Sequence, residues 1–263
     1  MRFPLVKLQY PSRWAMGISA LTACALATIA LIAVAWWNAD HPVHRYDDSA
    51  QGEVLVSKDG RTITIATTWG DCEVPPRLQA QENASDVRLT LRREDHAQPG
   101  HVCNNSGVKQ IATTLDQPVG RRTVIDAMTG KHIPVFNERH LAAPGYLPKG
   151  YIYSDSLASS NVAGGKIPTP FEWPPTPTWT TAYQRDSFHG YLAITQATGN
   201  YVETTGTPAT INGHQAFLQL SPSSVDRCSI TWFDGTYTFN VYDSDPQQQP
   251  TRDEVLKIAE NLH

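Results

Sequence analysis

The feature that most constrains this sequence is an apolar run from Ala15 to Trp37, which contains no charged residue. At 1.5 Å per residue a helix of this length covers about 34 Å, enough to cross a hydrocarbon core of roughly 30 Å. The chain after the run is polar, rich in turn residues and built of short alternating segments. The run predicts a transmembrane helix over 15–37 that separates a short head, 1–14, from a large body.

Charged residues on either side of the run predict its orientation. The head has three basic residues and no acidic one, whereas Asp40, Asp47 and Asp48 follow the run against a single Arg45. Positive charge is retained on the cytoplasmic side, so we expect the N-terminus inside and the body outside. The predicted location is the cell membrane, crossed once, with the bulk of the chain extracytoplasmic.

Two other interpretations of the run follow from its own residues. Ala33-Val34-Ala35 has the form of a signal-peptidase site, and cleavage after Ala35 would make the body a secreted protein. Leu21-Thr22-Ala23-Cys24 has the form of a lipid-attachment motif, but apolar residues rather than a polar tether follow it. The run is longer than the roughly 7–15 apolar residues of a signal core, which favours a retained anchor.

The composition of the body excludes some classes of partner. Without the three basic residues of the head, 18 Lys and Arg stand against 25 Asp and Glu, a net charge of about −7. This acidic balance argues against nucleic acid and against an electrostatic grip on anionic polymers. Only 17% of the chain is charged, while Thr, Ser, Gln, Gly and Pro are plentiful, which is typical of exported β-rich domains.

The first part of the body has the pattern of an antiparallel β-sandwich. After an expected tether, 38–51, the module 52–136 alternates apolar and polar residues in short segments. Asp59-Gly60 and the turn 83–86 each lie between two such segments, and a last hairpin is expected over 123–133. Strands at this spacing predict an immunoglobulin-like fold.

The second part, 147–263, has the pattern of a sheet that ends in a helix. Asn212-Gly213 and Asp234-Gly235 mark hairpins. Thr251 and Glu254 form a capping box, which begins a helix. The apolar stripe of that helix consists of Val255, Ile258, Ala259 and Leu262. The predicted class is α+β and mainly β, with a curved antiparallel sheet that carries a C-terminal helix.

The cysteines outside the run fit an oxidising compartment. Cys72 and Cys103 fall in one module, and a disulfide between them would contribute roughly 3–4 kcal/mol. Cys228 shares a strand face with Ile230 and Trp232, so we expect a buried inert thiol, with a reactive or intermolecular thiol as the alternative.

Two stretches resemble known bacterial modules. Asp59–Thr62, Gly70-Asp71-Cys72, Cys103 and Gln117–Asp126 are similar to a small disulfide-bonded β domain of exported and membrane-anchored actinobacterial proteins. This resemblance implies an extracytoplasmic setting and supplies no catalytic residue.

The C-terminal stretches Ile211–Ala216, Ile230–Phe239 and Glu254–Leu262 resemble the end of an uncharacterised extracytoplasmic domain. Such domains are related to the lipoprotein-carrier and sigma-regulator sensor folds. The resemblance implies a curved sheet with a helix in its hollow.

The sequence contains no motif of a serine hydrolase elbow, a zinc peptidase, a phosphate-binding loop or a redox dithiol. We therefore expect neither catalysis nor a cofactor nor a metal. Aromatic residues are the better indication of a ligand or partner surface, although in β-rich domains they are more often core. The candidate residues are Trp173, Trp179, Tyr183, Phe188 and Tyr191.

The favoured hypothesis is a membrane-anchored extracytoplasmic protein that binds or senses a lipid, a peptide or an envelope protein. The first alternative is an envelope hydrolase acting on wall polymer or peptide, for which Asp186, Ser187 and His189 are the residues to test. The second alternative is a purely structural envelope protein.

Overall fold

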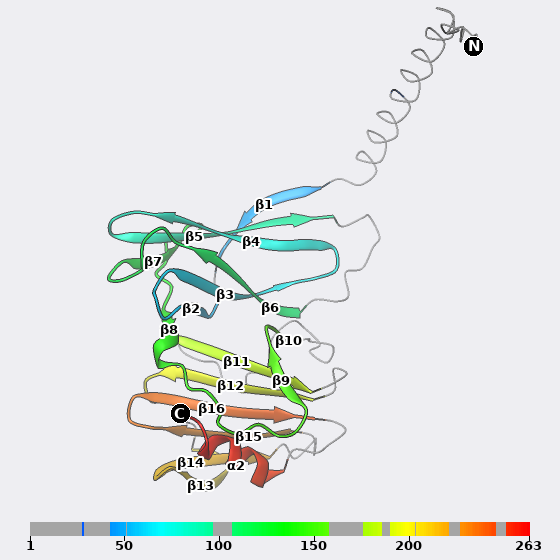
Figure 1. Ribbon diagram of the computed structural model, residues 1–263, viewed down its shortest axis with the longest axis vertical. Helices are drawn as coiled ribbons and strands as arrows, with labels where there is room; N and C mark the ends of the chain where they lie inside the picture. Colours follow the sequence, from blue (N-terminus) through cyan, green and yellow to red (C-terminus); the bar gives the residue numbers. More distant parts are fainter. Residues whose placement is uncertain are drawn as a thin grey trace, which may run out of the picture. The chain divides into compact units, whose positions relative to one another are not determined.

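The computed structural model describes residues 28, 43–50, 52–96, 107–157, 176–185, 190–202, 204–220, 227–245 and 251–263. The predicted span, 15–37, lies outside these residues except for Thr28. Among the described residues, no helix is long and apolar enough to cross a membrane. Residues 45–95 and 102–263 belong to one unit, which is mainly β with one α-helix in its described part (Figure 1).

The N-terminal half of this unit contains two sheets. The first sheet has the order β1 (His44–Asp48), β5 (Asp86–Asp95), β4 (Glu73–Glu82), and β7 (Thr123–Asp126) also pairs with β5. The second has the order β10 (Ser156–Leu157), β6 (Gly107–Thr114), β3 (Thr62–Trp69), β2 (Val54–Val56), β8 (Val135–Asn137).

Alternate residues of the two sheets form one hydrophobic core. Ile63 and Ile65 of β3 are fully buried, and they belong to the same cluster as Leu89 and Leu91 of β5. The two hairpins predicted at Asp59-Gly60 and at residues 83–86 are confirmed by the antiparallel pairs β2–β3 and β4–β5.

Two features of these sheets differ from the sequence-based expectation, and one further hairpin agrees with it. β1 lies in the segment that was expected to be a tether. Its five residues are mostly polar and show no alternation of apolar and polar side chains. Ion pairs such as Arg93–Asp48 link β1 to β5. β8 and β7 pair in parallel with β2 and β5. The hairpin expected over 123–133 is confirmed: Ile125 and His132 form an antiparallel bridge, the Asp126 N–H donates to the Lys131 carbonyl and the Ile133 N–H to the Val124 carbonyl, both at 2.9 Å.

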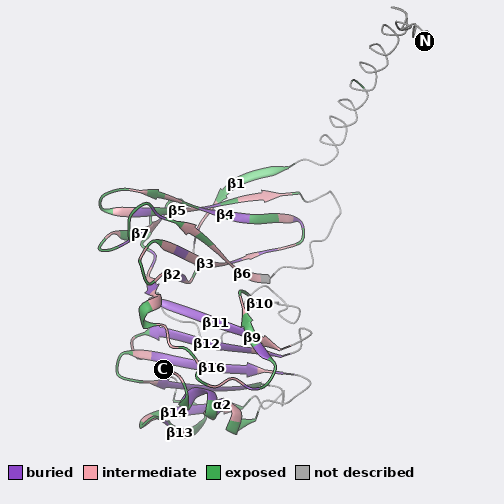
Figure 2. Ribbon diagram, in the orientation of Figure 1, coloured by how far each residue is buried: buried purple, intermediate pink, exposed green. Residues whose placement is uncertain are grey.

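The C-terminal half forms a seven-stranded sheet in which every pair is antiparallel. Its order is β13 (Thr207–Ile211), β14 (His214–Leu220), β15 (Arg227–Phe233), β16 (Tyr237–Ser244), β12 (Tyr191–Thr198), β11 (Thr178–Arg185), β9 (Tyr151–Ser154). The turn Asn212-Gly213 joins β13 to β14 with φ of 50° and 85°, the positive values that a tight hairpin turn requires. The buried central strands are visible in Figure 2.

The helix α2 (Arg252–Glu260) packs on this sheet as the apolar stripe predicts. The capping box is present, since the Thr251 side chain accepts from the Glu254 N–H and the Glu254 carboxylate accepts in return. Val255, Ile258 and Ala259 are fully buried in one cluster with residues of β15 and β16. The predicted helix and the two predicted hairpins beside it are therefore confirmed.

The side chain of Glu53, the residue before β2, joins the two halves of the unit. β9 pairs only with residues 182–185 of β11, so the β11 edge is open at Thr180. There the Glu53 carboxylate accepts from the Thr180 backbone N–H at 2.7 Å and from its hydroxyl at 2.8 Å. Burial raises the pKa of Glu53, while the two bonds from Thr180 oppose the shift. The carboxylate thus satisfies an edge donor that none of the described strands reaches.

Candidate functional site

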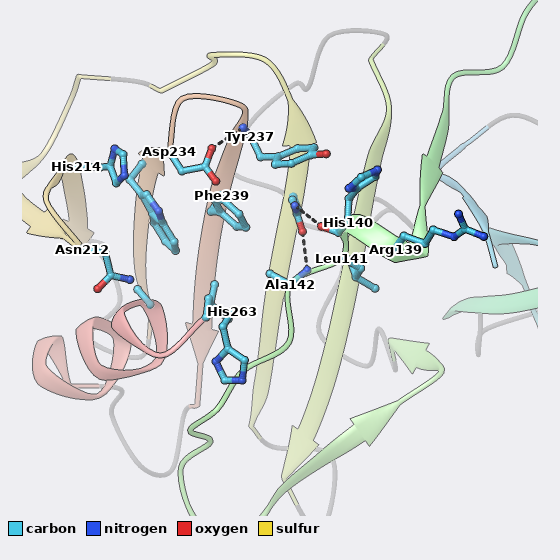
Figure 3. Close-up of a pocket in the computed structure, with 14 residues that line it drawn as sticks. Arg139, His140, Leu141, Ala142, Asn212, His214, Asp234, Tyr237, Phe239 and His263 are labelled. Atoms are coloured by element: carbon cyan, nitrogen blue, oxygen red, sulfur yellow. Dashed lines mark hydrogen bonds between the residues drawn. The ribbon is translucent and has the colours of Figure 1, made fainter. Parts of the chain in front are cut away.

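A hollow of about 350 Å³ lies on the seven-stranded sheet beside the C-terminal end of α2 (Figure 3). Strands β12, β14, β15 and β16 contribute to it, together with the segment 139–142 and the last two residues of the chain. We call it the sheet hollow. Concave sites of this kind, built from aromatic residues with a few polar groups, are the usual form of a small-ligand site.

Aromatic rings supply much of the apolar surface of the sheet hollow. Trp232 on β15 lies directly opposite Phe239 on β16, and their rings stack at 5.0 Å with 13° between the planes. The ring of Tyr237 meets that of Phe239 edge to face at 6.4 Å. Because side chains alternate along a strand, Tyr237 and Phe239 fall on one face of β16. Trp232 and Phe239 are only 4% and 6% exposed, so this pair forms the buried floor of the hollow, and the half-buried Tyr237 offers the accessible ring.

One buried amide holds the wall formed by residues 139–142. The Gln196 side chain on β12 is 1% exposed. Its Nε2 donates to the His140 carbonyl at 2.8 Å, and its Oε1 accepts from the Ala142 N–H at 2.9 Å. Figure 3 shows both bonds across the hollow. The amide therefore fixes a segment that has no strand partner of its own.

The end of the chain forms another wall. Ala143 and His263 exchange backbone hydrogen bonds of 2.8 and 3.2 Å, and the Gly145 N–H donates to the Asn261 carbonyl at 2.7 Å. A Cβ at position 145 would lie 2.5 Å from the His263 ring, so a larger residue there would displace this ring. The pairing holds the His263 ring at the hollow.

The rim of the sheet hollow provides hydrogen-bonding groups. His140, His214 and His263 all line it. The Asp234 carboxylate is engaged by the hairpin turn, where it accepts from the backbone N–H groups of Thr236 and Tyr237. The lining includes no serine or cysteine, and the described residues contain no cluster of three or more potential metal ligands. The arrangement is suited to holding a ligand by stacking and hydrogen bonds.

A second polar cluster lies at the end of the same sheet, where β9 and β16 approach. The Tyr151 hydroxyl donates to the Asp243 carboxylate at 2.6 Å, and Arg185 pairs with Asp245 at 2.9 Å. Asp243 is 2% exposed. Burial raises its pKa to about 6, against the opposing effects of the Tyr151 bond and the Arg185 charge. The cluster is enclosed, so it has the character of a buried network.

Cys228 is a free thiol, and it is buried beside this network. It faces Asp243 across the β15–β16 pair, and burial together with that carboxylate raises the pKa of the thiol to about 12. The structure therefore matches the expected buried thiol.

We expect Cys228 in the folded chain to react with a maleimide at neutral pH at least a hundredfold more slowly than in guanidinium. The thiolate is the reactive form, and both its formation and its access are suppressed. Mass spectrometry of the peptide that carries Cys228 measures the rate. Equal labelling of the folded and unfolded chain would contradict the buried placement.

The sequence-predicted aromatic surface is only partly described. Trp179 and Tyr183 are 2% and 8% exposed, so these two side chains offer little area to a ligand or partner. Tyr191 packs on Tyr242 with ring centroids 5.4 Å apart. Trp173 and Phe188 lie outside the described residues, as do Asp186, Ser187 and His189.

Of the two cysteines in the predicted disulfide, Cys72 is among the described residues. Cys72 is buried and disulfide-bonded. Cys103 lies outside the described residues, so its pairing with Cys72 stays a prediction.

The sheet hollow was not predicted from the sequence. A partial signal was present, because Trp232 and Phe239 occupy facing positions of a recognisable hairpin. Their convergence with His140 and His263 depends on long-range pairing, which local spacing does not encode.

Comparisons of this chain with protein-family models, with curated proteins and with solved structures found no match.

Proposed function

We propose that this chain is a membrane-anchored extracytoplasmic binding protein, and that the sheet hollow holds its ligand. The observation that carries the proposal is the convergence of the half-buried Tyr237 ring, edge-on to the buried Trp232–Phe239 pair, with polar groups in one cavity. Rings offer stacking area at a small entropic cost, and the rim selects ligands by hydrogen bonding.

The size of the cavity limits the ligand. At about 350 Å³ it lies near the lower end of the range for small-molecule sites. A short peptide that inserts one aromatic or apolar side chain fits this volume and uses the polar rim. We therefore assign the ligand to the class of short peptides with such a side chain.

The extracytoplasmic part of the proposal is supported by two observations. The apolar run 15–37 and its charge asymmetry predict an anchored chain with its body outside. The disulfide-bonded Cys72 fits an oxidising compartment.

The proposal predicts that filling the hollow abolishes binding. The full chain in lipid nanodiscs is dialysed against a library of tripeptides, and peptides retained above the level of empty discs are identified by mass spectrometry. We expect Ala142→Phe, which places a ring in the hollow, to reduce retention at least tenfold. Its matched control is Ala127→Phe, at an exposed position away from the hollow, with retention unchanged.

Thermal unfolding verifies that both variants are folded. Retention by the folded Ala142→Phe variant at the wild-type level would exclude the sheet hollow as the binding site. Failure of the wild-type chain to retain any peptide would reject the proposed ligand class.

A further inference from the structure

Two arginines lie directly opposite each other on the outer face of the first sheet. Arg77 on β4 pairs in register with Arg92 on β5. The next pair along, Leu78 and Leu91, is buried in the core, so the two arginines point to the other face, where both are exposed. Like charges at facing positions of a sheet destabilise it. The pair of Arg92 with Asp47 at 3.2 Å offsets part of this cost, and an anion bound between the two arginines would remove more of it.

The arginine pair lies in a groove of about 550 Å³ formed by β1, β4 and β5. Four arginines line the groove against two acidic residues: Arg45, Arg77, Arg92 and Arg93 against Asp47 and Glu94. Arg93 is already paired with Asp48 and Glu73, which leaves Arg45, Arg77 and Arg92 against Asp47 and Glu94, a local excess of one positive charge on a body whose net charge is about −7.

Within the described ranges, two of these arginines take part in exposed ion pairs. Arg45 pairs with Glu94 at 2.8 Å with its side chain 72% exposed, and Arg92 pairs with Asp47 at 3.2 Å with its side chain 55% exposed. Exposed pairs of this kind contribute little and exchange readily. Arg45 and Arg92 are therefore able to bind a stronger anion, as is the exposed Arg77.

Exposed apolar side chains accompany the basic groups. Tyr46 on β1 and Val74 on β4 both line the groove and are 44% and 38% exposed, and Val43 beside β1 is 41% exposed. Arginine, tyrosine and small apolar residues together are the composition of surfaces that lie at a membrane interface.

The position of the groove along the chain indicates which anion it would meet. Six residues, 38–43, separate the predicted span from β1. An extended chain covers at most about 3.6 Å per residue, so these residues tether β1 within about 25 Å of the membrane in which 15–37 would be anchored. A cationic groove on such a tether has anionic headgroups as its nearest and most concentrated anions.

We propose that this groove binds the phosphate of an anionic phospholipid headgroup of the outer leaflet between Arg77 and Arg92, with Tyr46 and Val74 at the interface. The proposal rests on the anchoring in the proposed function and is independent of the sheet hollow. It places the first sheet against the membrane.

The test uses the full chain in liposomes that contain phosphatidylglycerol, with a trace of phosphatidylglycerol that carries a photoactivatable headgroup. After illumination, crosslinked peptides are mapped by mass spectrometry. We expect crosslinks in segments 43–47, 73–77 and 90–94. An arginine near an anionic surface contributes about fivefold to binding, so Arg77→Gln/Arg92→Gln should lower crosslinking in these segments at least fivefold.

The matched control is Arg121→Gln/Lys131→Gln, which removes the same charge from exposed positions outside the groove and should leave the crosslinks unchanged. The Arg77→Gln/Arg92→Gln variant removes a like-charge pair together with the exposed Arg92–Asp47 ion pair, which contributes little, so we expect it to fold as stably as the wild type. Crosslinks confined to residues 15–42, or equal crosslinking of both double variants, would overturn the headgroup site.

Anchoring is measured separately by extraction of the same liposomes with alkaline carbonate. Release of the chain would reject the anchoring of the proposed function. Retention together with absent groove crosslinks would reject only the headgroup site.

Discussion

The Phe136→Ala variant is expected to lower the free energy of unfolding of the chain by about 3–5 kcal/mol. Phe136 on β8 is 2% exposed, and its ring lies 5.7 Å from that of Tyr237 on β16. The substitution leaves a cavity where the second sheet meets the seven-stranded sheet. Because Tyr237 also lines the sheet hollow, the variant removes support from the proposed site.

Urea unfolding of the full chain in detergent, followed by tryptophan fluorescence and circular dichroism, measures this effect. The matched control is Met128→Ala, which removes a large apolar side chain that is 53% exposed. It should change stability by less than about 0.5 kcal/mol. A loss below about 1 kcal/mol for Phe136→Ala would show that this contact does not join the two halves of the unit.

The Asp243→Asn variant is expected to be more stable than the wild type above neutral pH and equal to it in acid. Burial raises the pKa of Asp243 from 3.8 to about 6, so the folded chain holds this proton more tightly than the unfolded chain does. The resulting stabilisation is complete below about pH 3.8 and is lost as the pH rises through about 6. At about 1.4 kcal/mol per pH unit, the difference between the variants approaches about 3 kcal/mol at pH 8.

Asparagine cannot ionise, yet its oxygen still accepts from the Tyr151 hydroxyl. The free energy of unfolding of each chain is measured with denaturant at pH 4 and pH 8. The variant is compared with the wild type at the same pH, so the contributions of the other titrating groups cancel. Asp116→Asn, at an exposed position, is the matched control for the substitution itself. If Asp243→Asn were the less stable chain at pH 8, the ionised carboxylate would be the stabilising form, through Arg185.

Local chemistry explains which elements the sequence predicted. Asp-Gly and Asn-Gly turns demand positive φ, as the 50° at Asn212 and 85° at Gly213 illustrate, and such turns are readable from two residues. The helix α2 was equally readable, since its capping box and its stripe at Val255 and Ile258 lie within one short segment.

Long-range pairing explains what the sequence did not predict. β1 has no alternation of apolar and polar residues, and it pairs with β5. Charged pairs such as Arg93–Asp48 link the two strands, and their members are more than forty residues apart in the sequence. The parallel pairing of β7 with β5 was likewise not predicted, although the local hairpin on the other edge of β7 was. The facing arginines 77 and 92 became visible only through the register of β4 and β5.

The same limit applies to the candidate site. The aromatic residues close together in sequence include Trp179 and Tyr183, which are buried. Trp232 and Phe239 line the sheet hollow together with residues 139–142 and His263. The Gln196 side chain holds residues 139–142 in place, and the backbone pairing of Ala143 with His263 holds the last residue. Spacing along the chain therefore located a hairpin but not the cavity above it.

The most direct test of the sheet hollow follows the NMR resonance of the Trp232 indole N–H. The full chain is labelled with ¹⁵N-tryptophan, placed in nanodiscs and titrated with the retained tripeptides. Trp232→Phe assigns the resonance, and Trp69, buried in β3 outside the hollow, is the internal reference. We predict a saturable shift of the Trp232 resonance with that of Trp69 unchanged. A Trp232 resonance that does not move while peptide binds would contradict the account.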